Sequence, residues 1–374
     1  MRIGVPRERA RGERRVAAIP DVAKIYVEWG FEVAIEPGAG RTSGYPDALY
    51  TEVGAVVSGD AISADLVLRV GPPEPAELRT MNEGAIVAGF LDPFLSPDIV
   101  QAALDRKLTA LAMEAIPRTT LAQPMDALSS QANIAGYAAV LLGATATPRL
   151  LPMMVTAAGT IPPSRVLVLG VGVAGLQAIA TARRLGAVVH AYDIRTETRE
   201  QVESLGAKFV EAVTTGSDEG GYAVEVSTDT QAQQHAALEP FVAAADLIVT
   251  TAQIPGRRAP LLVTEKMVRS MRPGSVIVDM AAATGGNVAK SLADGVVEVD
   301  GVTIHGPIDL ASRYPADASR MYSRNLLALL QRMRNIESGE LGVDLDDEIV
   351  GVCAVTAGGV ARHPKTVELL GVTT

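Results

Sequence analysis

The feature that most constrains the fold is the segment 166–193, which has the pattern of a strand, a glycine turn, a helix and a second strand. An apolar run, 166–169, is followed at once by G-x-G-x-x-G at residues 170–175. An alanine-rich stretch with helical spacing then leads past a glycine at 186 into another apolar run. This order is typical of a parallel-sheet βαβ unit whose turn holds a pyrophosphate.

Each glycine of the motif has a distinct physical task. Gly170 permits the tight turn, Gly172 lets the backbone approach the phosphates, and Gly175 allows the helix to pack closely on the strand. Asp193 ends the second apolar run, roughly 20 residues further on, where the acid that binds the ribose normally stands. Because a carboxylate accepts from both ribose hydroxyls and repels a 2′-phosphate, the pattern predicts NAD(H) as the ligand.

Two alternatives to this interpretation follow from the same residues. A glycine-rich turn with no ligand would also show the motif, but the strand, helix, second strand and acid together favour the nucleotide site. Arg195 and Arg199 come shortly after Asp193. Since nearby arginines can accommodate a 2′-phosphate, NADP stays open as a second ligand.

Composition limits the class of protein. A chain of 374 residues with 48% apolar and 20% charged residues is long enough for two or three globular domains. The net charge of −10 argues against a nucleic-acid or anionic-membrane surface, and the single cysteine, Cys353, excludes an internal disulfide or a cysteine-cluster zinc site. No metal motif is present, and no apolar run reaches about 18 residues, so we expect a cytoplasmic protein without direct membrane insertion.

The first half of the chain alternates strands and helices. Asp21 is the expected N-cap of the first helix, and a second helix is expected at 96–107. The expected strands are 2–5, 32–36, 64–70, 84–90 and 108–113. Residues 117–129 then form a polar loop with two prolines, and a small-residue helix over 129–145 is long enough to bridge two domains.

The second half repeats this alternation around the glycine motif. The polar, glycine-containing run 214–235 is expected to be a loop, either a lid or an ordinary surface loop. An amphipathic helix over 317–336 could return the chain to the first domain. We therefore predict an α/β fold of two Rossmann-like, doubly wound parallel-sheet domains with the nucleotide cleft between them. The predicted domains are 1–137 plus 311–374, and 138–310.

Proton-transfer groups are scarce. A dehydrogenase acting on a hydroxy or amino acid normally needs a His or Lys near the hydride donor. The chain has four histidines, and His190 is expected in the core whereas His235 and His363 are expected in solvent. Only His305, at the end of a strand, is expected to face the cleft. The sequence thus predicts a nucleotide site without evident acid–base machinery.

Several runs carry a resemblance to a known family. They are Arg118…Gln123-Pro-Met-Asp126-Ala-Leu-Ser129-Ser-Gln-Ala-Asn, Thr156-Ala-Ala-Gly-Thr-Ile-Pro-Pro, the glycine motif, Gly220-Gly-Tyr222, Ile254-Pro-Gly and Met271-Arg-Pro-Gly. Together they resemble the NAD(H)-binding component, domain I, of proton-translocating transhydrogenase, over nearly the whole chain. That family shares its fold with alanine dehydrogenase.

Three positions separate the two activities. The resemblance implies that an alanine dehydrogenase would carry a lysine at Gly71, a histidine at Asp92 and an aspartate at Ala283. Arg15 does match a substrate-carboxylate arginine of alanine dehydrogenase, but one arginine cannot perform the proton transfer. An alanine-type amino-acid dehydrogenase and a non-catalytic NAD(H) sensor are kept as alternatives.

The resemblance also implies sites and partners. Arg118, Gln123, Asp126 and Ser129 would hold the nicotinamide end, with Asp126 and Ser129 acting only as helix caps in the alternative interpretation. The expected NAD(H) site consists of Gly170, Gly172, Val173, Gly175, Asp193, Ile194, Tyr222 and Ala252, with Tyr222 on a lid. The expected protein is a homodimer that meets an NADP(H)-binding subunit and membrane-domain subunits at the inner face of the membrane. Gln253 and Asp309 depart from the family pattern.

Overall fold

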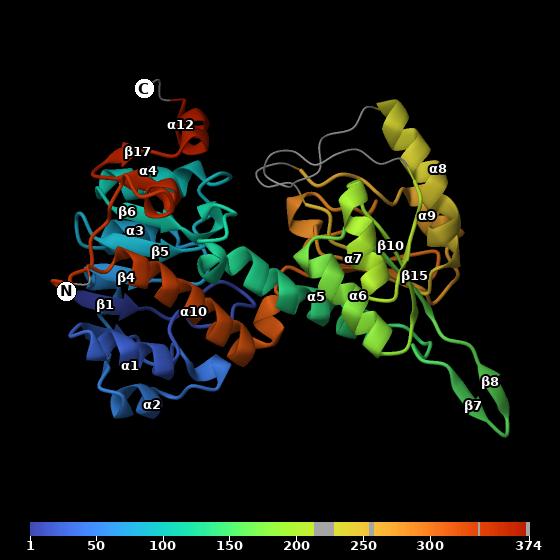
Figure 1. The fold of residues 1–374 in the computed structure, drawn as a ribbon, viewed down its shortest axis with the longest axis horizontal. Coiled ribbons are helices and arrows are strands. Elements are labelled where there is room, and N and C mark those ends of the chain that lie inside the picture. Colours follow the sequence, from blue (N-terminus) through green and yellow to red (C-terminus); the bar gives the residue numbers. More distant parts are fainter. Residues whose placement is uncertain (213–227, 254–257, 336, 372–374) are drawn as a thin grey trace. The chain divides into compact units, whose positions relative to one another are not determined.

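The computed structural model describes residues 1–212, 228–253, 258–335 and 337–371. The chain forms two compact units, residues 1–131 with 311–374 (unit 1) and residues 132–310 (unit 2). Each unit is built on a sheet whose strands are mostly parallel and carries its own helices (Figure 1). The predicted fold class, α/β with Rossmann-like parallel-sheet domains, is confirmed.

Unit 1 contains an eight-stranded sheet in the order β17-β16-β6-β5-β4-β1-β2-β3. Strands β1 to β6 run parallel, and β16 and β17 add an antiparallel edge. The strands are β1 Arg2–Val5, β2 Glu32–Ile35, β3 Val56–Val57, β4 Leu66–Leu68, β5 Ile86–Gly89, β6 Thr109–Ala112, β16 Ala354–Ala357 and β17 Val360–Ala361. The helices are α1 Pro20–Glu28, α2 Asp47–Glu52, α3 Pro75–Thr80, α4 Pro97–Asp105, α10 Pro315–Met333, α11 Val350–Cys353 and α12 Pro364–Leu370.

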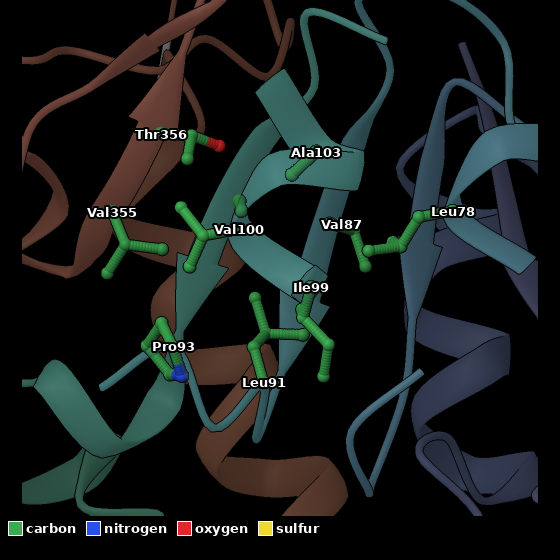
Figure 2. A pocket seen from close by; sticks show the side chains of 10 residues that line it. Leu78, Val87, Leu91, Pro93, Ile99, Val100, Ala103, Val355 and Thr356 are labelled. Atoms are coloured by element: carbon green, nitrogen blue, oxygen red, sulfur yellow. The ribbon is translucent and has the colours of Figure 1, made fainter. Parts of the chain in front are cut away.

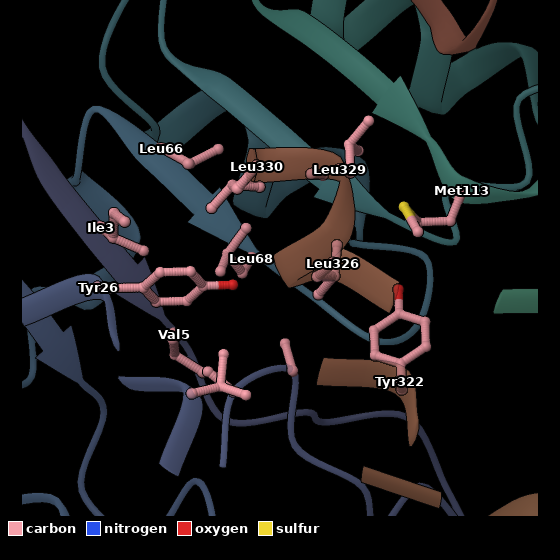
Figure 3. Close-up of a cluster of buried hydrophobic side chains, with 14 of the residues drawn as sticks. Ile3, Val5, Tyr26, Leu66, Leu68, Met113, Tyr322, Leu326, Leu329 and Leu330 are labelled. Atoms are coloured by element: carbon pink, nitrogen blue, oxygen red, sulfur yellow. The ribbon is translucent and has the colours of Figure 1, made fainter. Parts of the chain in front are cut away.

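Helix α10 completes the core of unit 1 although it lies far from the sheet strands in sequence. Its apolar face buries Leu326, Leu329 and Leu330 in one cluster with side chains of β1 and β4 (Figure 3). Fully burying a leucine contributes about 1.5–3 kcal/mol relative to leaving it in water. The α10 leucines therefore stabilise the unit strongly, which explains why the chain returns to it after residue 310.

Unit 2 contains a seven-stranded sheet in the order β11-β10-β9-β12-β13-β15-β14, parallel except at β14. The strands are β9 Arg165–Leu169, β10 Val188–Tyr192, β11 Lys208–Phe209, β12 Leu247–Thr250, β13 Val276–Asp279, β14 Gly295–Val299 and β15 Val302–Gly306. The helices are α6 Val173–Arg184, α7 Arg199–Ser204, α8 Thr228–Ala244 and α9 Glu265–Ser270, and α5 Ala127–Ala146 leads the chain in from unit 1. The strand order is that of a dinucleotide-binding Rossmann sheet, with its switch point between β9 and β12.

Two local predictions are wrong. Helix α1 begins at Pro20 with Ile19 at the N-cap, so Asp21 lies in the first turn and does not cap the helix. A proline at the first helical position is preorganised for this start, because its missing N–H would have no partner there. Residues 228–235, expected to belong to a loop, instead form the beginning of α8. Their polar composition reflects a helix with little apolar surface to bury.

A hairpin that the sequence did not predict precedes the glycine motif. Strands β7 Met154–Thr156 and β8 Gly159–Ile161 pair antiparallel, and the residues of both strands are exposed. The connecting Ala157-Ala158 lacks the Asn-Gly signature of a tight hairpin turn, so no turn signal marked this position. Among the described residues, no helix has the length and apolar character needed to cross a membrane.

Candidate dinucleotide-binding site

The glycine turn lies at the switch point of the unit 2 sheet, and two of its glycines are required by packing. Gly170 has φ +96°, and a Cβ there would lie 2.7 Å from Thr251 Oγ1 and 2.8 Å from Ala252 N. A Cβ on Gly175 would lie 1.9 Å from the Gly170 carbonyl oxygen. The predicted roles of these residues, the tight turn and the close helix–strand approach, agree with this geometry.

Gly172 differs from Gly170 and Gly175 because no atom of the described residues lies within 4 Å of the position that its Cβ would take. It is the N-cap of α6, and the first N–H groups of a helix have no intrahelical acceptor. Val173, the first residue of α6, is exposed. The helix therefore presents N–H donors and the positive end of its dipole to open space, which suits an anion such as a phosphate.

Asp193 directly follows β10 and is held against the glycine turn. Its Oδ2 accepts a hydrogen bond from Val171 N at 2.7 Å, and its side chain is nearly buried. The Arg195 guanidinium forms an ion pair with it, Nε to Oδ1 at 2.9 Å and Nη2 to Oδ2 at 2.9 Å. Hydrogen bonds from that guanidinium to the carboxylate raise the pKa of Arg195. Ile194, between them, is half-buried.

The neighbouring strand end is organised by two buried residues that the sequence analysis missed. Asn287 accepts from Ala252 N at 3.1 Å and donates to Ala252 O and to Pro260 O, both at 2.8 Å. Asp279, at the end of β13, accepts from Asn287 N at 3.0 Å. Thr251 Oγ1 donates to Gly170 O at 3.0 Å, which links this network to the glycine turn. The sequence could have indicated Asp279, because it is a polar residue at the end of an otherwise apolar strand.

Some predicted positions lie elsewhere or outside the described residues. Tyr222 and the turn at 254–256 are among those that the structure does not describe. Gln253 is exposed and donates to Met280 O at 2.9 Å, so its amide is anchored at the same sheet edge. Asp309 is half-buried.

The four residues predicted to hold the nicotinamide end belong to unit 1. Arg118 and Gln123 are exposed, with Gln123 opening the short 3₁₀ helix η4 Gln123–Met125. Asp126 precedes α5 and accepts from Ser129 N at 2.8 Å and from Ser129 Oγ at 2.6 Å. The structure thus brings Asp126 and Ser129 together in the geometry of a helix cap, while both side chains stay partly accessible.

This loop is fixed by residues of α10. Asn325 donates to Pro124 O at 2.8 Å and accepts from Ser130 Oγ at 2.7 Å. Gln131 donates to Ala318 O at 3.1 Å. Asn325 is a nearly buried polar side chain beside the leucines of the α10 apolar face, and that break in the pattern is the sequence signal that was overlooked.

Arg15, the possible substrate arginine, already has partners. Its guanidinium forms a two-pronged ion pair with Glu13 and donates to Gln131 Oε1 at 2.8 Å. Hydrogen bonds from Arg15 lower the pKa of Glu13, against the effect of burial, which would raise it. In this arrangement Arg15 holds Gln131, and with it the start of α5, in place.

The positions that would carry proton-transfer side chains in an alanine dehydrogenase hold other residues here. Gly71 donates its N–H to Glu8 Oε2 at 3.4 Å, and Ala283 is exposed in the 3₁₀ helix η6 Ala282–Thr284. Asp92 accepts from Ser96 Oγ at 3.0 Å, and burial raises its pKa. Its backbone N–H donates to Glu114 at 2.6 Å. None of these three positions therefore carries a lysine or histidine.

All four histidines are half-buried. His190 packs against Phe241 in unit 2, with ring centroids 5.4 Å apart, and burial lowers its pKa. His235, expected in solvent, is half-buried with Nε2 2.9 Å from Leu261 O. His363, which was also expected in solvent, is half-buried and caps α12 by accepting from Lys365 N. His305 is half-buried in β15.

Neither Cys353 nor the small cavity of unit 1 is suited to binding a ligand. Cys353 is fully buried, and burial raises the pKa of its thiol to about 12. In unit 1, side chains from α3, α4 and strands β5, β6 and β16 line a cavity of only about 10 Å³ (Figure 2). Its walls are almost wholly apolar and it has room for about one water, so it is a packing gap. No group of three or more His, Cys, Asp or Glu side chains suited to a metal occurs in the part of the chain that is described.

The strand order, the glycine turn and the terminal acid of unit 2 define a Rossmann domain of the dinucleotide-binding class. The chain belongs to the alanine dehydrogenase/PNT family. The N-terminal domain of that family matches residues 4–135, and its C-terminal domain matches residues 139–364. The resemblance to transhydrogenase that the sequence motifs carry is confirmed by the comparisons.

Three similar proteins place the chain within the family. The first part of NAD(P) transhydrogenase subunit alpha from Rhodospirillum rubrum is 46% identical over 377 residues, which cover 97% of this chain and 98% of that protein. The crystal structure of transhydrogenase from Sinorhizobium meliloti matches with a TM-score of 0.87 and 44% identity, over 96% of this chain and 100% of that chain. An L-alanine dehydrogenase matches with a TM-score of 0.82 and 28% identity, over 99% of each chain.

Proposed function

We propose that this chain is the NAD(H)-binding component of a proton-translocating transhydrogenase, and that it exchanges hydride with NADP(H) bound on a partner subunit. Relatives that are 46% and 45% identical over 97% and 96% of this chain are named as NAD(P) transhydrogenase subunits. Their names describe only the first portion of a subunit alpha, which implies further chains in the same enzyme. The NADP(H) site and the membrane domains would belong to those chains.

The observation that carries the proposal is the residue set at Gly71, Asp92 and Ala283. Oxidative deamination of an amino acid moves protons as well as a hydride, so it needs an acid–base side chain of suitable pKa. Transfer of hydride from C4 of one nicotinamide to C4 of another changes no protonation on either ring. The protein then has to orient two rings and exclude water, which the residues present can do without a general base.

Each predicted site residue has a role in this proposal. The α6 N-terminus with Gly172 and Val173 would receive the pyrophosphate, Asp193 the adenosine ribose, and Ile194 and Ala252 the faces of the adenosine. Arg118, Gln123, Asp126 and Ser129 would hold the nicotinamide end, and Tyr222, which lies outside the described residues, would contact the adenosine. The open space in front of Gly172 and the partial accessibility of Asp126 and Ser129 support these assignments.

We further propose a homodimer that associates with the membrane only through its partner subunits. The exposed apolar side chains of the β7–β8 hairpin, which include Met154, Val155 and Ile161, support self-association. Membrane association through partners accords with the lack of a membrane-crossing helix among the described residues.

The test mixes the purified chain with an NADP(H)-binding transhydrogenase subunit and follows reduction of an NAD analogue by NADPH. We expect hydride transfer that depends on both proteins. The same preparation receives pyruvate, ammonia and NADH, and we expect no NADH oxidation. NADH oxidation in that second assay would establish the amino-acid dehydrogenase instead, and binding of both nucleotides without transfer would establish the sensor.

A further inference from the structure

The Asp193 carboxylate has no acceptor position to spare. A carboxylate offers about four lone-pair positions, two on each oxygen. Oδ1 accepts from Arg195 N at 2.9 Å and from Arg195 Nε at 2.9 Å. Oδ2 accepts from Val171 N at 2.7 Å and from Arg195 Nη2 at 2.9 Å. A ribose cannot donate its hydroxyls to this carboxylate until one or more of these donors leaves.

The donors fall into two groups of different mobility. The N–H groups of Val171 and Arg195 belong to the backbone two and three residues beyond the ends of β9 and β10, which pair with each other up to Leu169 and Tyr192. The Arg195 guanidinium is on a flexible side chain that is 19% exposed. If the guanidinium swings out, one position opens on Oδ1 and one on Oδ2. This is the arrangement that two vicinal hydroxyls require.

We propose that Arg195 occupies the place of the adenosine ribose in the free protein, is displaced when the nucleotide binds, and thereby sets the selectivity between NAD(H) and NADP(H). This inference rests on the proposed binding of NAD(H) at Asp193. Before binding, the guanidinium holds the nearly buried carboxylate in its orientation through two hydrogen bonds. After displacement, it remains close to the ribose, where a 2′-phosphate can pair with it.

The second arginine of the segment supplies a matched control. Arg199 pairs with Glu211 at 2.8 Å and lies over the Phe209 ring, 5.2 Å from its centroid. It has the same charge and lies four residues from Arg195, but its described contacts are with β11 and Glu211. Replacing Arg199 therefore reproduces the loss of one positive charge near the site without releasing Asp193.

Two opposite effects are expected from Arg195→Ala. NADH binds about fivefold more tightly, because its hydroxyls no longer compete with a partly exposed ion pair of typical strength. NADPH binds more weakly at the same site, because the 2′-phosphate loses its cation and meets an uncompensated carboxylate. A merely structural role of Arg195 would weaken both nucleotides together, so the opposite signs identify competition.

The experiment uses isothermal titration calorimetry to measure the dissociation constants of three ligands: NADH, NADPH and an NADH analogue whose adenosine lacks the 2′-hydroxyl. Each ligand is titrated into the wild type and into the variants Arg195→Ala, Arg195→Lys and Arg199→Ala. We expect tightening of NADH in Arg195→Ala, a smaller gain for the deoxy analogue that lacks one competing hydroxyl, an intermediate value in Arg195→Lys, and no tightening in Arg199→Ala. Wild-type binding of NADH with equal or weaker binding in Arg195→Ala overturns this inference alone. Failure of the wild type to bind NADH overturns the proposed function itself.

Discussion

The buried carboxylate of Asp279 gives the sharpest test of what holds the candidate nucleotide-binding edge of the unit 2 sheet. It is inaccessible to water and accepts from Thr250 Oγ1 at 2.8 Å, Ala281 N at 3.0 Å, Asn287 N at 3.0 Å and Val288 N at 3.2 Å. Asp279→Asn keeps the shape of the side chain and replaces one oxygen by an NH₂ group. The change therefore removes acceptor capacity without creating a cavity.

The orientation of the new amide can be deduced from its neighbours. With NH₂ towards Asn287 and Val288, two buried N–H donors would lose their acceptor. With NH₂ towards Thr250, the hydroxyl can rotate and accept, and only the Ala281 N–H is left unsatisfied. The second orientation is favoured. One unsatisfied buried donor and the weakening of three charge-assisted bonds lower the free energy of unfolding of unit 2 by about 3 kcal/mol.

Two probes separate the units in a urea titration. Trp29, the only tryptophan, lies in unit 1, so its fluorescence reports that unit, whereas far-UV circular dichroism reports both. We expect Asp279→Asn to lower the midpoint of a dichroism transition and to leave the fluorescence transition in place. Hydrogen exchange at the Ala281 amide should accelerate about 100-fold, which corresponds to about 3 kcal/mol.

Thr250→Val is the companion variant. Alone it removes one donor and should cost about 1 kcal/mol. Combined with Asp279→Asn it removes the hydroxyl that accepted from the new NH₂, so the double variant should lose more than the sum of the two. A loss below about 1 kcal/mol in Asp279→Asn, or strict additivity in the double variant, would refute this account of the network.

Three further predictions concern separate features. Gly172→Ala should fold with wild-type stability yet bind NADH at least tenfold more weakly in titration calorimetry. Gly175→Ala should destabilise unit 2 by about 1–3 kcal/mol, because the added Cβ would collide with the carbonyl oxygen of Gly170. Equal stabilities of the two variants would contradict the packing argument. Burial raises the pKa of Glu114 to about 7 from 4.5, so the folded state holds its proton while the unfolded state loses it, and stability falls as pH rises from about 4.5 to 7. Glu114→Gln, followed by Trp29 fluorescence in urea, should therefore gain up to about 3 kcal/mol relative to wild type between pH 4 and pH 8, and a constant difference would refute it. Val155→Asp on the exposed hairpin should convert a dimer to a monomer in sedimentation velocity; an unchanged dimer would exclude β7–β8 from the interface.

The sequence was most informative where local rules determine the structure. The β9–α6–β10 unit follows from one apolar run, three glycines and one acid, and each of these has a local physical requirement. The end of α1 was also predictable, because Gly30 takes φ +89° just after the helix. In contrast, α8 begins with a polar run, 228–234, so the composition of that stretch resembled that of a loop.

The candidate site was only partly predictable because its supports are long-range. Asn287 reaches Ala252, and Asn325 reaches Pro124, across distances in sequence that no motif spans. The ion pair of Asp193 with Arg195 is short-range, but its consequence depends on how many donors converge on one carboxylate, which only side-chain positions reveal. Motifs therefore located the candidate nucleotide site, and the structure added what holds it in shape.

The central claim, that hydride passes directly between two nicotinamides, is tested most directly with an isotope. NADPH deuterated at the transferable C4 position is mixed with an oxidised NAD analogue, this chain and an NADP(H)-binding transhydrogenase subunit in ordinary water, and the product is examined by mass spectrometry and NMR. The account predicts that nearly all the deuterium arrives at C4 of the reduced analogue. Loss of the label to water, or an inert mixture in which both nucleotides are bound, would contradict it.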